Sequence, residues 1–142
     1  MSDLTAIVER AHRCWNSGDL AGYLAMYDPS MRLHGYAPDP MDKKATVKFY
    51  EDVWLALGME GKPNPSLELH ETVANGDLFA CRYTMQGIHR ADIYGVRATG
   101  RSYKVSGITI ARFASGRVVE RWSATDIISL LTQLGAITPS DE

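Results

Sequence analysis

Residues 67–87 read LELHETVANGDLFACRYTMQG and form two strand-like segments around a turn. The turn is Asn75-Gly76-Asp77, and Asn-Gly is the strongest short signal for a tight β-hairpin. Apolar and polar residues alternate on both sides of it, over Leu67–Ala74 and Leu78–Gly87, as expected for strands with one buried face. This stretch predicts an antiparallel hairpin and marks the change from helical to strand periodicity.

A second hairpin and a final helix are predicted further along the chain. Val105–Phe113 and Arg117–Trp122 are strand-like, and Ala114-Ser115-Gly116 between them supplies a glycine for the positive-φ position of a turn. The final helix, Ile127–Leu134, begins directly after Asp126 and carries apolar residues on one face.

Three segments before the first hairpin have helical periodicity, because their apolar residues recur three and four positions apart. These residues are Leu4, Ile7, Val8, Ala11, Cys14 and Trp15 in the first helix, Leu20, Tyr23, Leu24 and Tyr27 in the second, and Phe49, Tyr50, Val53, Trp54 and Leu57 in the third. Asp19 and Asp42 are expected to cap the second and third helices, and Asp28-Pro29 is expected to end the second. Helices, then an antiparallel meander, then one helix is an α+β order, in which the sheet can curl around the helices and enclose a pocket.

Length and composition predict a single domain over residues 1–142, large enough to bury a core without metals or disulfides. The net charge of -2, with mixed signs, gives no basic stripe for nucleic acid and no polybasic patch for a membrane. There is no apolar run of transmembrane length and no signal-like N-terminus, and Cys14 and Cys81 fit packed thiols. We expect a cytoplasmic protein that binds neither nucleic acid nor membranes.

Motifs for cofactors and metals are missing from the sequence. Glycines occur singly at turns, and neither of the common nucleotide-binding glycine motifs is present. The histidines, which are His12, His34, His70 and His89, have no metal-ligand spacing. We therefore expect no metal and no cofactor, which leaves acid–base chemistry by polar side chains placed among aromatic residues.

Asp126 is the leading candidate for such chemistry. It lies at a strand-to-helix junction beside Trp122, where burial would raise its pKa and make it an acid or base near neutral pH. The competing interpretation is a helix N-cap. Arg82 lies in the middle of a strand and either faces solvent or enters the cavity, where Asp126 would be its partner. That partner would lower the pKa of Asp126 and oppose the effect of burial.

Other polar and aromatic residues are candidates for substrate contacts. His34 either faces inward or is a partly exposed loop residue, and His89 either binds a substrate oxygen or holds the loop that follows it. Glu120, the second carboxylate near Asp126, is expected on the surface. So small a protein has limited room to bury all its large aromatic residues in one solid core, so some are expected to line a cavity. These are Trp15, Tyr27, Tyr50, Trp54 and Trp122.

Three blocks of sequence carry a family resemblance through their order and spacing. The first is WNSGDL at 15–20, and the second holds Gly-Asp at 76–77, Arg-Tyr-Thr at 82–84 and Gly-Ile-His at 87–89. The third contains Thr-Gly-Arg at 99–101, GRVVERW at 116–122, Asp126 and Gln-Leu-Gly at 133–135. Together they resemble the SnoaL-like polyketide cyclases of the nuclear-transport-factor-2-like superfamily, over nearly the whole chain.

The resemblance implies a cone-shaped α+β barrel of the cystatin-like, SnoaL-like type, with N-terminal helices packed in a strongly curved antiparallel sheet around an apolar cavity. It implies a cofactor-free intramolecular aldol condensation, with Asp126 as the acid/base group and His34 as a substrate contact. Thr109 stands where characterised cyclases can carry a histidine, so it joins the expected substrate contacts. A homodimer that pairs through the outer sheet face is also implied.

We predict a SnoaL-like enzyme acting on a hydrophobic or aromatic small molecule that carries a carbonyl group. Asp126 would transfer the proton. Arg82, His34 and His89 would orient the Asp126 carboxylate or stabilise the enolate. Two alternatives stay open: an enzyme resembling epoxide hydrolases or dehydratases, and a non-catalytic small-molecule binding domain of the same fold. Thr84 stands where hydrolases of this fold carry a second carboxylate, which counts against hydrolysis.

Overall fold

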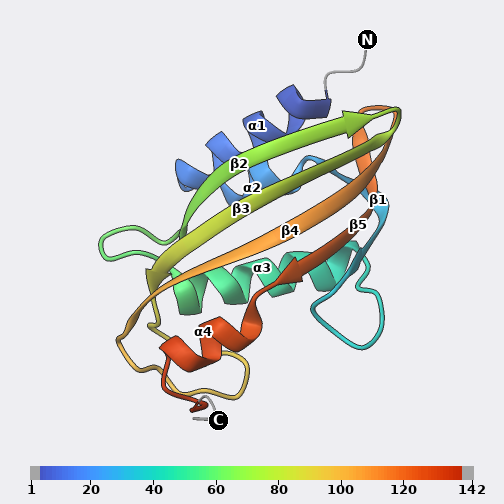
Figure 1. Ribbon diagram of the computed structural model, residues 1–142. Coiled ribbons are helices and arrows are strands. Elements are labelled where there is room, and N and C mark those ends of the chain that lie inside the picture. Colours follow the sequence, from blue (N-terminus) through green and yellow to red (C-terminus); the bar gives the residue numbers. More distant parts are fainter. Residues whose placement is uncertain (1–3, 139–142) are drawn as a thin grey trace.

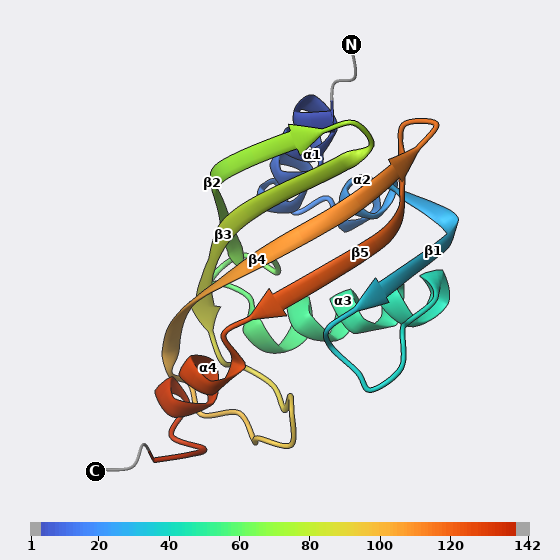
Figure 2. The same cartoon turned by 45° about the vertical axis from the view of Figure 1, so that its right-hand side comes forward.

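The protein is a curved sheet wrapped around helices (Figure 1). The structure, a computed structural model, describes residues 4–138. Its elements are α1 (Leu4–Asn16), α2 (Leu20–Leu24), β1 (Tyr27–His34), α3 (Lys43–Leu57), β2 (Ser66–Asn75), β3 (Leu78–Ile88), β4 (Ser102–Ala114), β5 (Arg117–Thr125) and α4 (Ile127–Gln133). The first three helices lie on one face of the sheet, here called the inner face, and α4 lies at one end of the sheet (Figures 1 and 2). None of the helices within residues 4–138 is long and apolar enough to cross a membrane.

The sheet has the strand order β1-β5-β4-β3-β2. Strands β2 to β5 form the predicted antiparallel meander, with each strand pairing with the next along the chain. Strand β1 adds to the far edge of β5 in parallel, so the complete sheet is mixed (Figure 2). The predicted α+β class and curved sheet are confirmed.

Both predicted hairpins are confirmed and have two-residue turns. In the first, Asn75 pairs with Leu78, and Gly76 has a φ of +62°. In the second, Ser115 and Gly116 both have positive φ, of 51° and 77°. Positive φ at both central positions matches the right-handed twist of the flanking strands, and glycine adopts it without steric cost.

The predicted caps of the second and third helices are confirmed. Asp19 accepts a hydrogen bond from the Gly22 amide (2.8 Å), and Asp42 accepts one from the Ala45 amide (2.9 Å). Gly18 follows the end of α1 and has a φ of +84°, a conformation that glycine adopts readily at helix ends. The local sequence thus determines where these helices begin and end.

The second predicted helix is too long. It ends at Leu24, and Tyr27 already begins strand β1. Asp28-Pro29 therefore lies within this strand and does not mark the end of the helix. A short apolar run fits both periodicities, and pairing with β5 decides between them. The pairing is irregular between Tyr27 and Arg32, so the missing amide hydrogen of proline interrupts no regular ladder there.

The two faces of the sheet differ in burial. Along β4, Val105 and Phe113 are buried against the helices, whereas Ile108 and Ile110 lie on the outer face with exposed fractions of 56% and 44%. Each fully buried side chain of this size stabilises the fold by about 1.5–3 kcal/mol. The inner face therefore carries the core, and the outer face retains apolar residues that the helices do not cover.

Candidate active site

An apolar cavity lies between the inner face of the sheet and the helices. The space in which the centre of a water molecule fits is about 70 Å³, several times the roughly 10–15 Å³ that one bound water needs. The described residues that line it include one arginine, Arg121, and one histidine, His12, but no aspartate or glutamate. The cavity therefore carries positive charge without an acidic side chain to balance it.

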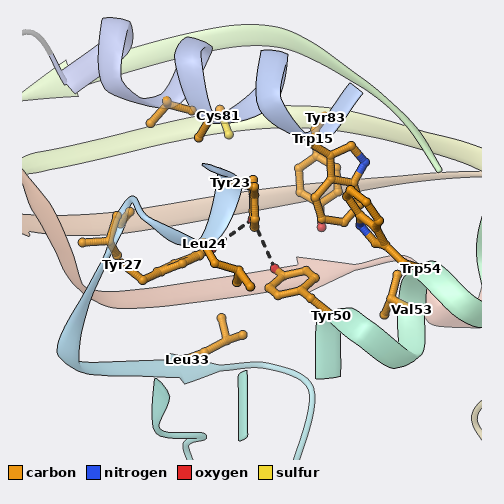
Figure 3. Packing of buried hydrophobic residues seen from close by; sticks show 14 of the residues in the cluster. Trp15, Tyr23, Leu24, Tyr27, Leu33, Tyr50, Val53, Trp54, Cys81 and Tyr83 are labelled. Carbon is orange, nitrogen blue, oxygen red and sulfur yellow. Dashed lines mark hydrogen bonds between the residues drawn. The ribbon is translucent and has the colours of Figure 1, made fainter. Parts of the chain in front are cut away.

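Arg121 provides this charge from strand β5. The residue is only 8% exposed, and its Nη1 donates to the hydroxyl groups of Tyr27 (2.8 Å), Tyr23 (3.3 Å) and Tyr50. The Tyr23 hydroxyl lies 3.0 Å from that of Tyr27 and donates to that of Tyr50 at 3.4 Å (Figure 3). These three residues, the tyrosine cluster, surround one side of the guanidinium with neutral oxygens.

The other side of the guanidinium contacts two further hydroxyls. Nη2 donates to Thr109 Oγ1 (3.0 Å) and to Ser123 Oγ (3.4 Å), and Nε donates to Thr109 Oγ1 (3.3 Å). Among residues 4–138 no carboxylate forms an ion pair with it. Burial alone would lower the pKa of Arg121, but the surrounding phenol oxygens hold it well above its usual range, so the side chain stays charged.

A β-bulge turns Arg121 toward the cavity. Phe113 pairs with Val118 and Arg112 pairs with Glu120, so Val119 is an extra residue on β5 without a counterpart. The extra residue shifts the alternation of side chains by one position. As a result Val118 and Arg121 both face inward although they are three residues apart.

A second group of hydroxyls, the hydroxyl cluster of Tyr36, Tyr83, Ser123 and Thr125, lies beside the guanidinium. The Tyr36 hydroxyl is 2.9 Å from Ser123 Oγ, 2.9 Å from Thr125 Oγ1 and 3.3 Å from the Tyr83 hydroxyl. Burial would raise the pKa of Tyr36, but the charge of Arg121 and these hydrogen bonds lower it below its usual value. Burial raises the pKa of Tyr83. Tyr36 is thus the more acidic phenol of the cluster.

Two glycines make room for the hydroxyl cluster. Gly35 has a φ of +115°, and a Cβ there would lie 1.9 Å from the Ser123 carbonyl oxygen. At Gly107 a Cβ would lie 2.4 Å from the Tyr83 hydroxyl oxygen. Larger residues at either position would displace the backbone of β5 or the phenol, which explains why glycine stands there.

His12 lines the same cavity and carries a buried nitrogen without a hydrogen-bond partner among the described residues. The residue lies on α1, and this nitrogen is Nδ1. Burial and the positive charge of Arg121 lower the pKa of His12 from 6.5 to about 4. The imidazole is therefore neutral at neutral pH and can accept a proton or a hydrogen bond.

Four predicted substrate contacts do line the cavity, namely Trp15, Tyr27, Tyr50 and Thr109. Three of them contact Arg121 directly. Trp15 packs edge-on against Tyr50 and Tyr23, with ring centroids 5.5 and 4.9 Å apart, and so holds the tyrosine cluster in place (Figure 3). Their part in substrate binding stays a prediction.

The expected entry of Arg82 into the cavity is wrong. Alternation along β3 turns Cys81 and Tyr83 inward, which leaves Arg82 on the outer face. There it forms an ion pair with Glu71, with 2.7 Å between Nε and Oε1. The expected pairing of Arg82 with Asp126 is therefore replaced by a surface pair.

Asp126 occupies the helix N-cap position that the sequence offered as an alternative. Its carboxylate accepts a hydrogen bond from the Ser129 amide (3.0 Å) and is exposed. Its two neighbours, Thr125 and Ile127, line the cavity, whereas Asp126 lies in a shallow depression on the outer face with Arg82. The expected placement of its side chain at the cavity mouth is not found.

His34 and Trp122 also lie on the outer face. The His34 ring is stacked on Trp122 at 5.4 Å, with 7° between the planes, and His34 Nε2 is 2.6 Å from Glu120 Oε2. The inward orientation expected for His34 and the cavity-lining role expected for Trp122 are wrong. In β1 the preceding residue, Leu33, takes the inward position, and the bulge in β5 moves Trp122 outward.

His89 and Trp54 are buried outside the cavity lining. His89 Nδ1 is 2.9 Å from Thr99 Oγ1 across the following loop, so the loop-holding alternative is confirmed. The ring of Trp54 packs against Trp15 at 5.2 Å from α3 (Figure 3). Neither side chain is positioned to contact a ligand in this cavity.

Three residues of the cavity are not predicted as site residues from the sequence, namely Arg121, Tyr36 and His12. One signal for the first was available: Arg121, Ser123 and Thr125 are polar residues at alternate positions of a strand that otherwise packs on the core. Such a pattern places three polar groups on one face. Tyr36 and His12 give no comparable signal, since a loop tyrosine and a helical histidine are common in surface and core positions alike.

Comparisons with known proteins agree with this fold. The sequence profile of the SnoaL-like polyketide cyclase family matches residues 5–134. Among curated protein sequences none matches significantly. No group of three or more potential metal ligands occurs in the part of the chain that the structure describes.

Solved structures from three Streptomyces species resemble the whole chain. AclR from Streptomyces galilaeus, provisionally assigned as a hydroxylase, is 26% identical with a TM-score of 0.84, over 97% of this chain and 99% of that one. IdmH from Streptomyces antibioticus, provisionally assigned as a polyketide cyclase, is 26% identical with a TM-score of 0.77, over 94% and 99%. TsrD from Streptomyces laurentii is 23% identical with a TM-score of 0.82, over 96% and 99%, and supports the fold alone. Since the family profile covers nearly the whole sequence, this chain belongs to the SnoaL-like polyketide cyclase family.

Proposed function

We propose that this single SnoaL-like domain is a polyketide cyclase-type enzyme that works by acid/base catalysis with its own side chains. Its substrate would be a hydrophobic or aromatic small molecule with a carbonyl group, and the reaction an intramolecular aldol condensation or an isomerisation. The observation that carries the proposal is Tyr36, a phenol whose pKa is lowered by Arg121 at the wall of an otherwise apolar cavity. Family membership supports the reaction class.

Tyr36 is the proposed hydrogen-bond donor to the substrate carbonyl. As a proton leaves the neighbouring carbon, negative charge develops on this oxygen, and a phenol of lowered pKa donates to it more strongly. Hydrogen bonds link Arg121 to the Tyr36 hydroxyl oxygen. Arg121 Nη2 donates to Thr109 Oγ1, and Thr109 Oγ1 donates to Ser123 Oγ at 3.3 Å. Ser123 Oγ in turn lies 2.9 Å from the Tyr36 hydroxyl. One well-placed donor of this kind contributes about 2.7–4 kcal/mol to transition-state stabilisation.

His12 is the proposed base. Its neutral imidazole lines the cavity, and Nδ1, which has no hydrogen-bond partner among the described residues, would take the proton from the carbon next to the carbonyl. The electron pair of the broken C–H bond becomes that of the enolate, which then attacks a second carbonyl in the same molecule. The proton on Nδ1 returns to the alkoxide formed in that step, so the enzyme ends unchanged.

Hydrogen exchange tests this mechanism without knowledge of the natural substrate. We expect the protein to accelerate deuterium exchange next to the carbonyl of 2-tetralone, measured by NMR. Tyr36→Phe should slow the catalysed exchange by about a hundredfold, and His12→Gln by a similar or larger factor. Arg112→Met, on the outer hairpin and paired with Asp77, is the control and should leave the rate unchanged.

Asp126→Asn separates this proposal from the assignment that the sequence suggests. Asparagine also caps helices, so the fold should persist in this variant. Exchange at the wild-type rate would support His12, whereas its loss with the fold intact would return the base role to Asp126. Ligand binding without exchange at any pH would instead favour a non-catalytic binding domain. The lack of a carboxylate among the described lining residues counts against the hydrolase alternative.

A homodimer in the cytoplasm is the remaining part of the proposal. The outer face of β4 and β5 exposes Ile108 and Ile110 beside the stacked rings of His34 and Trp122. A second copy would bury these apolar groups against their equivalents, as symmetric dimers do.

A further inference from the structure

Among residues 4–138 no carboxylate supplies a counter-charge for Arg121. Its guanidinium is buried, and its partners are neutral hydroxyl groups. Neutral acceptors satisfy the N–H groups but do not balance the charge that has been removed from water. A group that supplies the missing negative charge would gain far more at this position than at the protein surface.

Each guanidinium nitrogen of Arg121 already donates to a hydroxyl group, but several of these hydrogen bonds are long enough for a charged acceptor to replace them. Three of the contacts are long. Nη1 lies 3.3 Å from the Tyr23 hydroxyl, Nε lies 3.3 Å from Thr109 Oγ1, and Nη2 lies 3.4 Å from Ser123 Oγ. Charge-assisted bonds to a carboxylate are shorter, at about 2.7–2.9 Å. The Tyr50 hydroxyl accepts from both Arg121 and Tyr23, and its own hydrogen has no acceptor among the described residues. That hydrogen is a second donor for an incoming oxygen.

We propose that the ligand of this cavity carries a carboxylate, which binds to Arg121 and accepts a hydrogen bond from the Tyr50 hydroxyl. The planar guanidinium matches the two oxygens of a carboxylate, and the apolar and aromatic remainder of the cavity suits the hydrophobic part of the same molecule. The inference rests on the proposed function only in taking this cavity as the ligand site. It adds an anchor at Arg121, beside the hydroxyl cluster where the reacting carbonyl would lie.

His12 provides an independent signature of such binding. The other titratable groups of the cavity are the phenols of Tyr23, Tyr27, Tyr36, Tyr50, Tyr83 and Tyr94 and the thiol of Cys81. Arg121 is therefore the one permanently charged group among the described lining residues, and its charge contributes to the lowered pKa of His12. A carboxylate on Arg121 would remove that contribution, so the pKa of His12 should rise and binding should take up protons below neutral pH.

The test compares 2-naphthoate with its neutral amide, 2-naphthamide, by isothermal titration calorimetry. We expect the acid to bind the wild-type protein about ten- to a hundredfold more tightly than the amide, as a desolvated charge pair requires. Arg121→Met should abolish this preference while leaving amide binding within about threefold. The matched control, Arg112→Met, removes an exposed arginine and should keep the preference.

Proton uptake provides a readout that needs no arginine variant. Titrations near pH 5.5 in two buffers of different ionisation enthalpy should reveal uptake with naphthoate, less uptake with the amide, and loss of the difference in His12→Gln. The inference would be overturned by naphthoate that binds no better than the amide or not at all at millimolar concentration. Inorganic phosphate that binds as tightly as naphthoate would overturn the carboxylate class. Exchange activity on 2-tetralone is independent of all these outcomes, so the two proposals can fail separately.

Discussion

At the scale of single residues, Arg121 shows how a charge can be kept inside a small protein. The guanidinium is surrounded by hydroxyl groups that accept hydrogen bonds but carry no charge. Such an arrangement is weak evidence for a stabilising role, because burying a charge costs more than neutral hydrogen bonds return. A function in ligand binding gives the better reason for the residue.

Replacing this arginine with methionine tests that reason through stability. We expect Arg121→Met to be as stable as the wild type or more stable, by up to roughly 2 kcal/mol, because methionine fills a similar volume without a charge to desolvate. Urea unfolding followed by circular dichroism measures the difference. A loss of several kcal/mol would assign Arg121 a structural role instead.

His12 makes stability depend on pH. Its pKa is about 4 in the folded protein and 6.5 when unfolded, so the unfolded state binds more protons between these values. Its contribution is constant above pH 6.5, and stability falls as the pH drops toward about 4, by roughly 3 kcal/mol in total. Between pH 7 and 4 the wild type should therefore lose roughly 3 kcal/mol more stability than His12→Gln does. His70→Gln is the control, and curves that stay parallel would contradict the prediction.

At the scale of elements, the cap of α4 and the bulge of β5 have separate consequences. Asp126 accepts from the Ser129 amide, so Asp126→Ala should cost about 1 kcal/mol, while Asp126→Asn should cost much less because asparagine caps equally well. Thermal unfolding of the two variants measures both values. Equal losses in the two variants would indicate that the carboxylate charge, rather than the cap, stabilises this end of the molecule.

The bulge of β5 explains the largest error in the sequence-based site. Simple alternation through 117–122 would turn Val118, Glu120 and Trp122 to the same face. Because Val119 is an extra residue, Arg121 faces inward with Val118, whereas Glu120 and Trp122 do not. A bulge forms where two strands pair with unequal numbers of residues, so it depends on the partner strand. The candidate arginine was therefore assigned to the wrong strand.

At the scale of the whole molecule, the outer face of the sheet predicts the oligomeric state. Ile108 and Ile110 are exposed there, and a glutamate in their place would be buried without a partner in a dimer. We expect Ile110→Glu to convert a wild-type dimer into a monomer, measured by sedimentation velocity at micromolar concentration. Leu55→Glu, at a position 67% exposed on α3, should leave the dimer intact. A wild-type monomer at this concentration would contradict the proposal.

The sequence alone determined the hairpins, most helix boundaries and the fold class, because these depend on neighbours along the chain. Asn75-Gly76 makes one turn, Asp42 begins α3, and alternation separates Tyr83 from Arg82. The tertiary structure alone decided that residues 27–34 form a strand and that Arg121 and His12 share a cavity. Parallel pairing, a bulge and a shared cavity each bring together residues distant in sequence, and local periodicity carries no information about such contacts.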